Sequence, residues 1–249
     1  MNQTIIQVEG LAVGFAGQAL LQGLDFTVDR GRVFVILGGS GCGKSTLLKA
    51  MIGLQRPLAG RILIDGDDIA AAEGEDKRII QRRFGVAYQA GALFGSMTLL
   101  ENVALPLEEY TALDAAAIEL TARMKLSLVG LAGFEQRLPA ELSGGMQKRA
   151  AIARAMALDP AILFLDEPSA GLDPVTSAEI DRLILRLVDN LGITFVVVSH
   201  ELASIFAIAH RVIMLDKGQR GIIAAGDPRA LRDGSANPRV RQFFNREAS

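Results

Sequence analysis

Short apolar runs alternate with amphipathic stretches along much of the chain. Residues 33–37, 162–165 and 194–198 are almost continuously apolar, which is typical of strands buried on both faces of a parallel sheet. Between the last two runs, apolar residues recur from Ile180 to Leu191 at the spacing of an amphipathic helix. This order of strand, helix and strand predicts an α/β fold whose parallel sheet has helices on both faces.

The N-terminal region has a different pattern. Leu24, Phe26 and Val28 alternate with polar residues, as in an antiparallel strand with one buried face. Residues 5–15 form a second expected strand, so a small antiparallel sheet is predicted ahead of the α/β core. Further strands are expected at residues 61–64, 84–89, 211–215 and 222–225, and a helix from residue 46 to about residue 53.

The middle of the chain has no long β-branched run. Between residue 90 and about residue 138 the one clear pattern is a helical stretch at 114–128, and another helix is expected from Ser143 to residue 157. The segment after Pro238 is short and amphipathic, and we expect it to pack on its own domain or on a second copy. We therefore expect one domain over residues 1–249, with a helical subdomain inserted at about 90–157 and a short C-terminal tail at 236–249.

Composition limits the classes of partner. The 249 residues include 26 basic and 28 acidic side chains, so the net charge of -2 gives no general attraction to nucleic acid or to an acidic membrane. Cys42 is the only cysteine, which excludes an intrachain disulfide and favours a reducing compartment. The first residues lack the basic and apolar parts of a secretory signal, and the apolar runs are shorter than the roughly 20 residues that span a bilayer. Any action at a membrane is therefore expected to go through a partner.

The segment after the first buried run carries the strongest chemical signal. It fits G-x-x-x-x-G-K-[ST] between a strand and a helix, the arrangement of a phosphate-binding loop (P-loop). Glycines there let several N–H groups converge on phosphate oxygens at a helix N-terminus. Lys44 is expected to reach the β- and γ-phosphates, and the Ser45 hydroxyl to complete a Mg2+ shell. The predicted phosphate-binding residues are Gly38, Gly39, Ser40, Gly41, Cys42, Gly43, Lys44, Ser45 and Thr46.

Two adjacent acids, Asp166 and Glu167, end the second buried run. The carboxyl ends of strands in open α/β sheets face the crevice where ligands bind. Asp166 is placed to hold Mg2+, mostly through water, and Glu167 is a natural general base for the water that attacks the γ-phosphate. Without the P-loop, the pair could also be two solvated acids at a strand end; with it, a nucleotide-hydrolysing site is favoured.

The chain resembles the ATP-binding cassette (ABC) ATPases. Residues 142–147, Leu-Ser-Gly-Gly-Met-Gln, are similar to the signature motif of that family, and Gln89, residues 169–173 and His200 lie at its Q-loop, D-loop and switch positions. The resemblance covers essentially the whole chain. It implies a P-loop NTPase (RecA-like) core with a small antiparallel β subdomain and a helical subdomain. It also implies Mg2+-dependent ATP hydrolysis coupled to transport.

The same resemblance implies roles for residues that are ambiguous by themselves. Gln89 would sense Mg2+ and the attacking water, whereas His200 would contact the γ-phosphate and hold Glu167 in line. Phe15 falls where the family usually places an aromatic ring that stacks on adenine. A lone histidine is more often structural, and His210, which lies outside the motifs, is expected to be a structural or a surface residue.

The signature motif implies a second copy of the chain. In the family it binds the γ-phosphate of ATP held by the opposite subunit, so two subunits enclose two nucleotides head to tail. One P-loop and one signature motif are present here, as in a single subunit that must dimerise to form complete nucleotide sites. Taken alone, Ser143 could be no more than a helix cap. The residues expected at the second nucleotide are Ser143, Gly144, Gly145 and Asp173.

Residues 38–54, 89–94 and 238–244 are most similar to ATPases of bacterial maintenance-of-lipid-asymmetry (Mla/Mce-type) phospholipid transporters. This resemblance implies a separate multispanning permease, an Mce-type lipid-binding protein in the same complex, and a position on the cytoplasmic face of the inner membrane. Phe94, Met97 and Leu99 are candidates to dock a permease helix, or else they belong to the core of the helical subdomain.

Three other functions remain open. The chain could serve a transporter of another small molecule, because the transported lipid would not touch this subunit. A soluble ABC ATPase acting on nucleic acid or ribosomes is disfavoured by the balanced charge and by the lack of a second cassette in tandem. A nucleotide-binding regulator without hydrolysis is disfavoured because Glu167 and His200 are both present.

Overall fold

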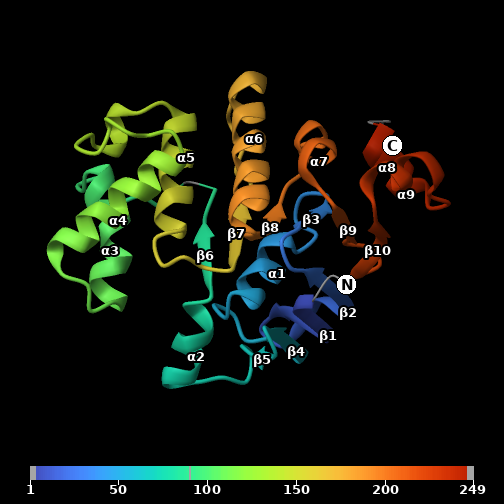
Figure 1. Ribbon diagram of the computed structural model, residues 1–249. Coiled ribbons are helices and arrows are strands. Elements are labelled where there is room, and N and C mark those ends of the chain that lie inside the picture. The colour runs from blue at the N-terminus through green and yellow to red at the C-terminus, as the bar shows by residue number, and fades with distance from the viewer. Residues whose placement is uncertain (1–3, 90, 246–249) are drawn as a thin grey trace.

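The computed structural model describes residues 4–89 and 91–245, and the positions predicted for Ala90 and for both chain ends lie outside these ranges. The fold is built on two sheets (Figure 1). The larger has six strands in the order β10-β9-β3-β8-β7-β6. These strands are β3 (Val33–Gly38), β6 (Phe84–Ala87), β7 (Ile162–Asp166), β8 (Thr194–Val198), β9 (Arg211–Asp216) and β10 (Gly221–Gly226).

The strands β9, β3, β8, β7 and β6 are all parallel, and β10 pairs antiparallel with β9. Strands β3 and β8 are buried along their whole length. The continuous apolar runs in the sequence therefore correspond to central parallel strands, as predicted. Strand β6 is shorter than the predicted 84–89 and ends at Ala87.

The smaller sheet is antiparallel, with the order β2-β1-β4-β5. Its strands are β1 (Thr4–Phe15), β2 (Gln18–Asp29), β4 (Ala59–Ile64) and β5 (Asp67–Asp68). Strand β2 begins six residues before the predicted 24–28, because its first half pairs with β1 through an irregular register and lacks a clean alternation. Phe26 of β2 stacks on Phe34 of β3 at 5.4 Å, which joins the two sheets.

Alternate residues of the six-stranded sheet enter two hydrophobic cores. Phe34 and Ile36 pack with the small sheet and with α1 (Lys44–Met51). Val33, Val35 and Leu37 face the opposite core, which contains α6 (Pro174–Leu191) and α7 (Leu202–Ile208). Both faces of the sheet are therefore covered, and the predicted α/β class with its antiparallel subdomain is confirmed.

The remaining helices lie at the edges of the sheet. In Figure 1, α3, α4 and α5 stand together beyond β6, at the end of the sheet opposite β10. The C-terminal helix packs on its own chain, where Phe244 lies 5.6 Å from the ring of Phe206. These helices are α2 (Gly74–Gln81), α3 (Leu99–Tyr110), α4 (Ala115–Leu128), α5 (Gly144–Ala155), α8 (Pro228–Gly234) and α9 (Pro238–Asn245), with a 3-10 turn at Pro139–Glu141.

Two helix ends match the sequence signals closely. Ser143 caps α5, and its hydroxyl accepts a hydrogen bond from the N–H of Met146. Gly192 ends α6 in the left-handed conformation, with φ of 67°. Within residues 4–89 and 91–245, no helix combines the length and the apolar character required to cross a membrane.

Candidate active site

The P-loop connects β3 to α1, and its backbone conformation and close packing require glycine at two positions. Gly38 has φ of 148°, and a Cβ there would lie 2.7 Å from the carbonyl oxygen of Leu215. Gly43 has φ of 105° and forms the N-cap of α1 without a side chain to accept a hydrogen bond. The first amides of α1 therefore have no side-chain acceptor, which fits a site for phosphate oxygens.

Lys44 folds back over this loop. Its Nζ donates to the carbonyl oxygens of Gly38 at 2.8 Å and Gly39 at 3.2 Å. Ser45 is exposed in the first turn of α1, and the Cys42 side chain is buried beneath the loop. Burial raises the pKa of the Cys42 thiol, although the nearby Lys44 charge opposes this rise. The thiol is therefore neutral and packs as a small apolar group.

Asp166 ends β7 beside the P-loop lysine. Burial raises the pKa of its carboxyl, and the charge of Glu167 raises it further, against the opposing charges of Lys44, Lys148 and Lys49. Among the residues that the structure describes, no basic side chain lies within 4.0 Å to form an ion pair with Asp166. A desolvated carboxylate of this kind is a fitting ligand for a divalent cation.

Glu167 and His200 form a pair of titratable side chains beyond the ends of β7 and β8. His200 Nδ1 lies 2.7 Å from Glu167 Oε1. Glu167 is 9% exposed and has φ of 50°, an unfavourable value for a residue with a side chain, and its N–H is held by the carbonyl of Val198 at 2.9 Å. Such backbone strain is concentrated at functional sites.

The start of α5 carries the signature residues Ser143, Gly144 and Gly145. A Cβ on Gly145 would lie 2.4 Å from Cγ2 of Thr176, so glycine is needed for α5 to pack against α6. Asp173 caps α6 and accepts hydrogen bonds from the N–H groups of Val175 and Thr176. The hydrogen bond from the Thr176 hydroxyl is the main reason that the pKa of Asp173 is lowered.

Some of the predicted site residues line two cavities beside the D-loop, residues 169–173. One, of about 440 Å3, is bounded by Glu167, His200 and the D-loop. The other, of about 460 Å3, is bounded by Gln89, Gly144 and the same loop. The P-loop is not among the residues that line either of these two cavities. Phe15 is 60% exposed at the end of β1, and His210 accepts a hydrogen bond from the N–H of Val33 at 3.0 Å, in a structural role.

One site residue was not predicted from the sequence. Lys148, on α5, donates through Nζ to the main-chain oxygens of Gln89 and Glu167. Burial lowers the pKa of this ammonium, while the charges of Asp166 and Glu167 oppose the shift. A lysine one turn into an amphipathic helix has no distinguishing pattern, so nothing in the sequence marks it.

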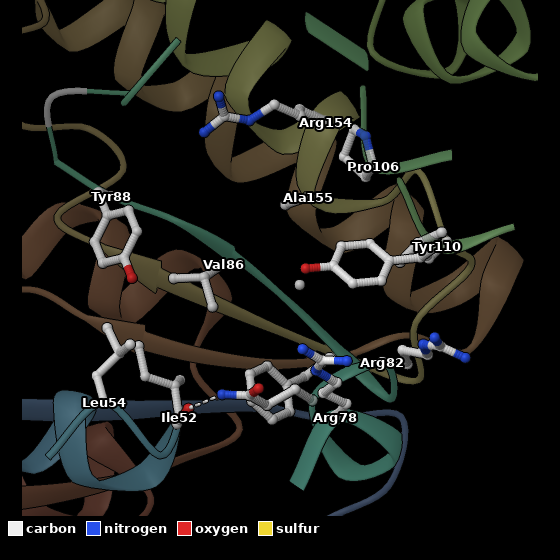
Figure 2. Close-up of a pocket in the computed structure, with 14 residues that line it drawn as sticks. Ile52, Leu54, Arg78, Arg82, Val86, Tyr88, Pro106, Tyr110, Arg154 and Ala155 are labelled. Carbon is white, nitrogen blue, oxygen red and sulfur yellow. Dashed lines mark hydrogen bonds between the residues drawn. The ribbon is translucent and has the colours of Figure 1, made fainter. Parts of the chain in front are cut away.

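A separate groove of about 300 Å3 lies where the α3–α5 helices meet the core (Figure 2). Val86 and Tyr88 line it from the β6 side, and Arg154 comes from α5. The guanidinium of Arg82 lies 5.6 Å above the ring of Tyr110 on its far wall. The sequence did not mark this groove.

The three residues expected to dock a permease helix differ in exposure. Phe94 is 50% exposed and Met97 is half-buried, but Leu99 is fully buried at the start of α3. Of the two alternatives for Leu99, the structure favours the second, because its side chain belongs to the core of the helical region.

Comparisons with known proteins agree with this geometry. The family model described as ABC transporter matches residues 21–170. MlaF of Escherichia coli K12, named an intermembrane phospholipid transport system ATP-binding protein, is 40% identical over 242 residues, covering 97% of this chain and 88% of MlaF. The mkl protein of Mycobacterium tuberculosis H37Rv, named a probable ribonucleotide transport ATP-binding protein, is 42% identical over 240 residues. That match covers 96% of this chain, which spans only 66% of the mkl length.

Solved structures give the same result. The cbiO1 subunit of an ABC transporter complex from Clostridium perfringens superimposes with a TM-score of 0.84 at 28% identity, covering 99% of this chain and 96% of cbiO1. The dimeric bacterial cassette MJ0796 has a TM-score of 0.80 at 30% identity, covering 89% of this chain and 98% of that cassette. The chain thus belongs to the ABC transporter family and is one of its ATPases.

Proposed function

We propose that this chain hydrolyses Mg2+-bound ATP as a head-to-tail dimer and so powers a phospholipid transporter. The observation that carries the catalytic part is the pair formed by Glu167 Oε1 and His200 Nδ1 at 2.7 Å, one residue beyond Asp166 at the end of β7. Glu167 acts as the general base that takes a proton from the attacking water. His200 fixes the orientation of that carboxylate and contacts the γ-phosphate.

The P-loop binds the phosphates through the amides at the start of α1, and Lys44 turns from the loop carbonyls to the phosphate oxygens. Phe15, exposed at the end of β1, offers its ring to the adenine. Ser45, Asp166 and Gln89 are the residues that would hold Mg2+, directly or through water. The bound ion supplies neutralisation of the negative charge that develops on the phosphate oxygens.

A second copy completes each site. Ser143, Gly144 and Gly145 form a helix start that is suited to an anion, and Gly144 lines a cavity with Gln89 and the D-loop that the P-loop does not line. We therefore assign them, with Asp173, to the nucleotide held by the opposite subunit. The dimeric cassette MJ0796, bound to ADP and Pi in one of its structures, supports this arrangement.

The groove of Figure 2 is our candidate for the contact with a permease. It lies between the core and the helical subdomain predicted over residues 90–157, and it is lined by apolar and basic side chains. Phe94 is exposed nearby, where its ring lies 5.8 Å from the guanidinium of Arg154, a residue of the groove. A short helix of a multispanning permease at the cytoplasmic face of the inner membrane fits this position.

The transported substrate is assigned from the relatives. MlaF matches over 88% of its own length and is named for phospholipid transport, so we propose a phospholipid transporter that includes an Mce-type lipid-binding protein. The name of mkl favours ribonucleotides as the second candidate. Both candidates use the same ATPase chemistry and differ in the permease.

Recovery of the native complex tests this proposal. Affinity-tagged chain is purified from detergent-solubilised membranes, and the co-purifying proteins are identified by mass spectrometry. We expect a multispanning permease and an Mce-type protein, and ATPase activity that depends on Mg2+. The Lys44→Ala variant serves as the control, since it should bring down the same partners without hydrolysis. Recovery of ribosomes or RNA in place of a permease would contradict the proposal.

A further inference from the structure

Lys148 connects three parts of the site that are distant in sequence. It lies on α5, five residues after the cap Ser143, and its Nζ donates to the main-chain oxygen of Gln89 and to that of Glu167 at 3.4 Å. One ammonium group thus spans the end of β6, the end of β7 and the helix that begins with the signature residues. An ammonium with three donors on a flexible stem is able to serve two carbonyls at once.

The neighbours of Lys148 on α5 point elsewhere. Gln147 donates to the carbonyl oxygens of Pro139 and Leu142, below the start of its own helix. Arg149 pairs with Glu179 of α6 at 2.7 Å. In this turn of α5, Lys148 is therefore the side chain that reaches Gln89 and the end of β7.

A second basic residue of α5 contacts the same loop three residues after Gln89. Arg154 donates to the carbonyl oxygen of Ala92 at 2.7 Å. The segment after β6 is thereby attached to α5 at residue 89 and again at residue 92. Because both bonds are made to main-chain oxygens, a displacement of α5 acts on the backbone of the loop, whatever side chains the loop carries.

We propose that Lys148 is a positioning residue that couples the location of the signature helix α5 to the orientation of Gln89 and Glu167. When α5 is seated, the ammonium holds both backbone segments at the distances seen here; when α5 is displaced, both are released together. Hydrolysis in one site is thus linked to the helix that presents the signature residues to the other. This inference rests on the roles proposed above for Gln89 and Glu167.

The test compares Lys148→Met with Lys148→Arg in the full-length chain. Met keeps the length of the stem without its charge, and we expect kcat to fall about 10- to 100-fold, as for the loss of hydrogen bonds from a charged group. The KM for ATP should stay within about twofold of the wild-type value, because Lys148 does not contact the P-loop. The substitution should therefore lower kcat and leave ATP binding nearly unchanged. Arg restores a donor and should keep kcat within about threefold of wild type.

A matched control and a double variant separate positioning from general stabilisation. Lys217→Met removes an exposed lysine between β9 and β10 and should leave kcat and the melting temperature unchanged. If Lys148 acts through Gln89, the fold-decrease in kcat of the double variant Lys148→Met/Gln89→Ala should be much smaller than the product of the fold-decreases in the two single variants. A purely structural role predicts a lower melting temperature in Lys148→Met with wild-type kcat for the folded fraction.

Two outcomes overturn the inference: an unchanged kcat in Lys148→Met, and fully multiplicative losses with Gln89→Ala. Glu167→Gln is measured in the same series. If Glu167→Gln abolishes turnover while Lys148→Met does not change it, the positioning role alone is wrong. If Glu167→Gln itself hydrolyses ATP at the wild-type rate, the proposed active site is wrong.

Discussion

Asp181 is predicted to make the stability of the fold depend on pH. This carboxyl lies on α6, 7% exposed, and burial raises its pKa from 3.8 to about 6. The charge of Glu201 contributes to the rise, whereas the Ser204 hydroxyl, which makes no hydrogen bond of good geometry, lies close enough to oppose it in part. The folded protein therefore binds the proton of Asp181 more tightly than the unfolded chain does.

The sign follows from linkage. Below pH 3.8 the carboxyl is neutral in both states, and as the pH rises from 3.8 to about 6 the folded state loses stability. Above pH 6 the penalty is complete, at about 3 kcal/mol for a shift of about two units. Asp181→Asn removes the ionisable group, so we expect this variant to be more stable than wild type by up to about 3 kcal/mol at pH 8 and by little at pH 4.

Urea unfolding of both proteins at pH 4, 6 and 8, followed by circular dichroism, measures this difference. Asp189→Asn is the matched control, because Asp189 lies on the same helix and is exposed. The control should follow wild type at every pH. A stability difference between Asp181→Asn and wild type that is the same at pH 4 and pH 8 would refute the reasoning.

Three further predictions concern the P-loop and the signature helix. Lys44→Ala should abolish ATP binding measured by equilibrium dialysis, because the ammonium group that contacts the phosphates is removed. A normal affinity for ATP would show that this loop is not the phosphate-binding site. The Cys42 thiol, buried and with a raised pKa, should react with iodoacetamide at pH 8 far more slowly in the folded protein than in urea; equal rates would show that it is accessible. Gly145→Ala should lower the melting temperature, since its Cβ would lie 2.4 Å from the Thr176 side chain; an unchanged melting temperature would show that α5 adjusts freely.

The central strands and α6 were predictable because burial alone determines their pattern. Strands buried on both faces read as apolar runs, and α6 combines strong periodicity with clear signals at its ends. Helix α2 was missed because its eight residues contain only two apolar side chains. Helix α3 was missed although Thr98 and Glu101 form a capping box at its start, since Pro106 interrupts the expected pattern.

The sequence predicted those parts of the site that consist of side chains in recognisable motifs. The pairing of Glu167 with His200 was expected from the family resemblance, and the structure brings the two together. The role of Lys148 could not be predicted from the sequence, because this side chain binds main-chain carbonyl oxygens, which every residue has. The exposure of Phe94 and the burial of Leu99 depend on how the helices pack, which local sequence does not determine.

The central claim is that Glu167 is the general base of an ATP site completed by a second copy of the chain. The most direct test is sedimentation of Glu167→Gln with Mg2+ and ATP, combined with nucleotide analysis of the dimer peak. We predict a dimer that forms only with ATP and holds two unhydrolysed nucleotides, with turnover slowed about 100- to 10,000-fold. A variant that stays monomeric with ATP, or that hydrolyses ATP at the wild-type rate, would contradict this claim.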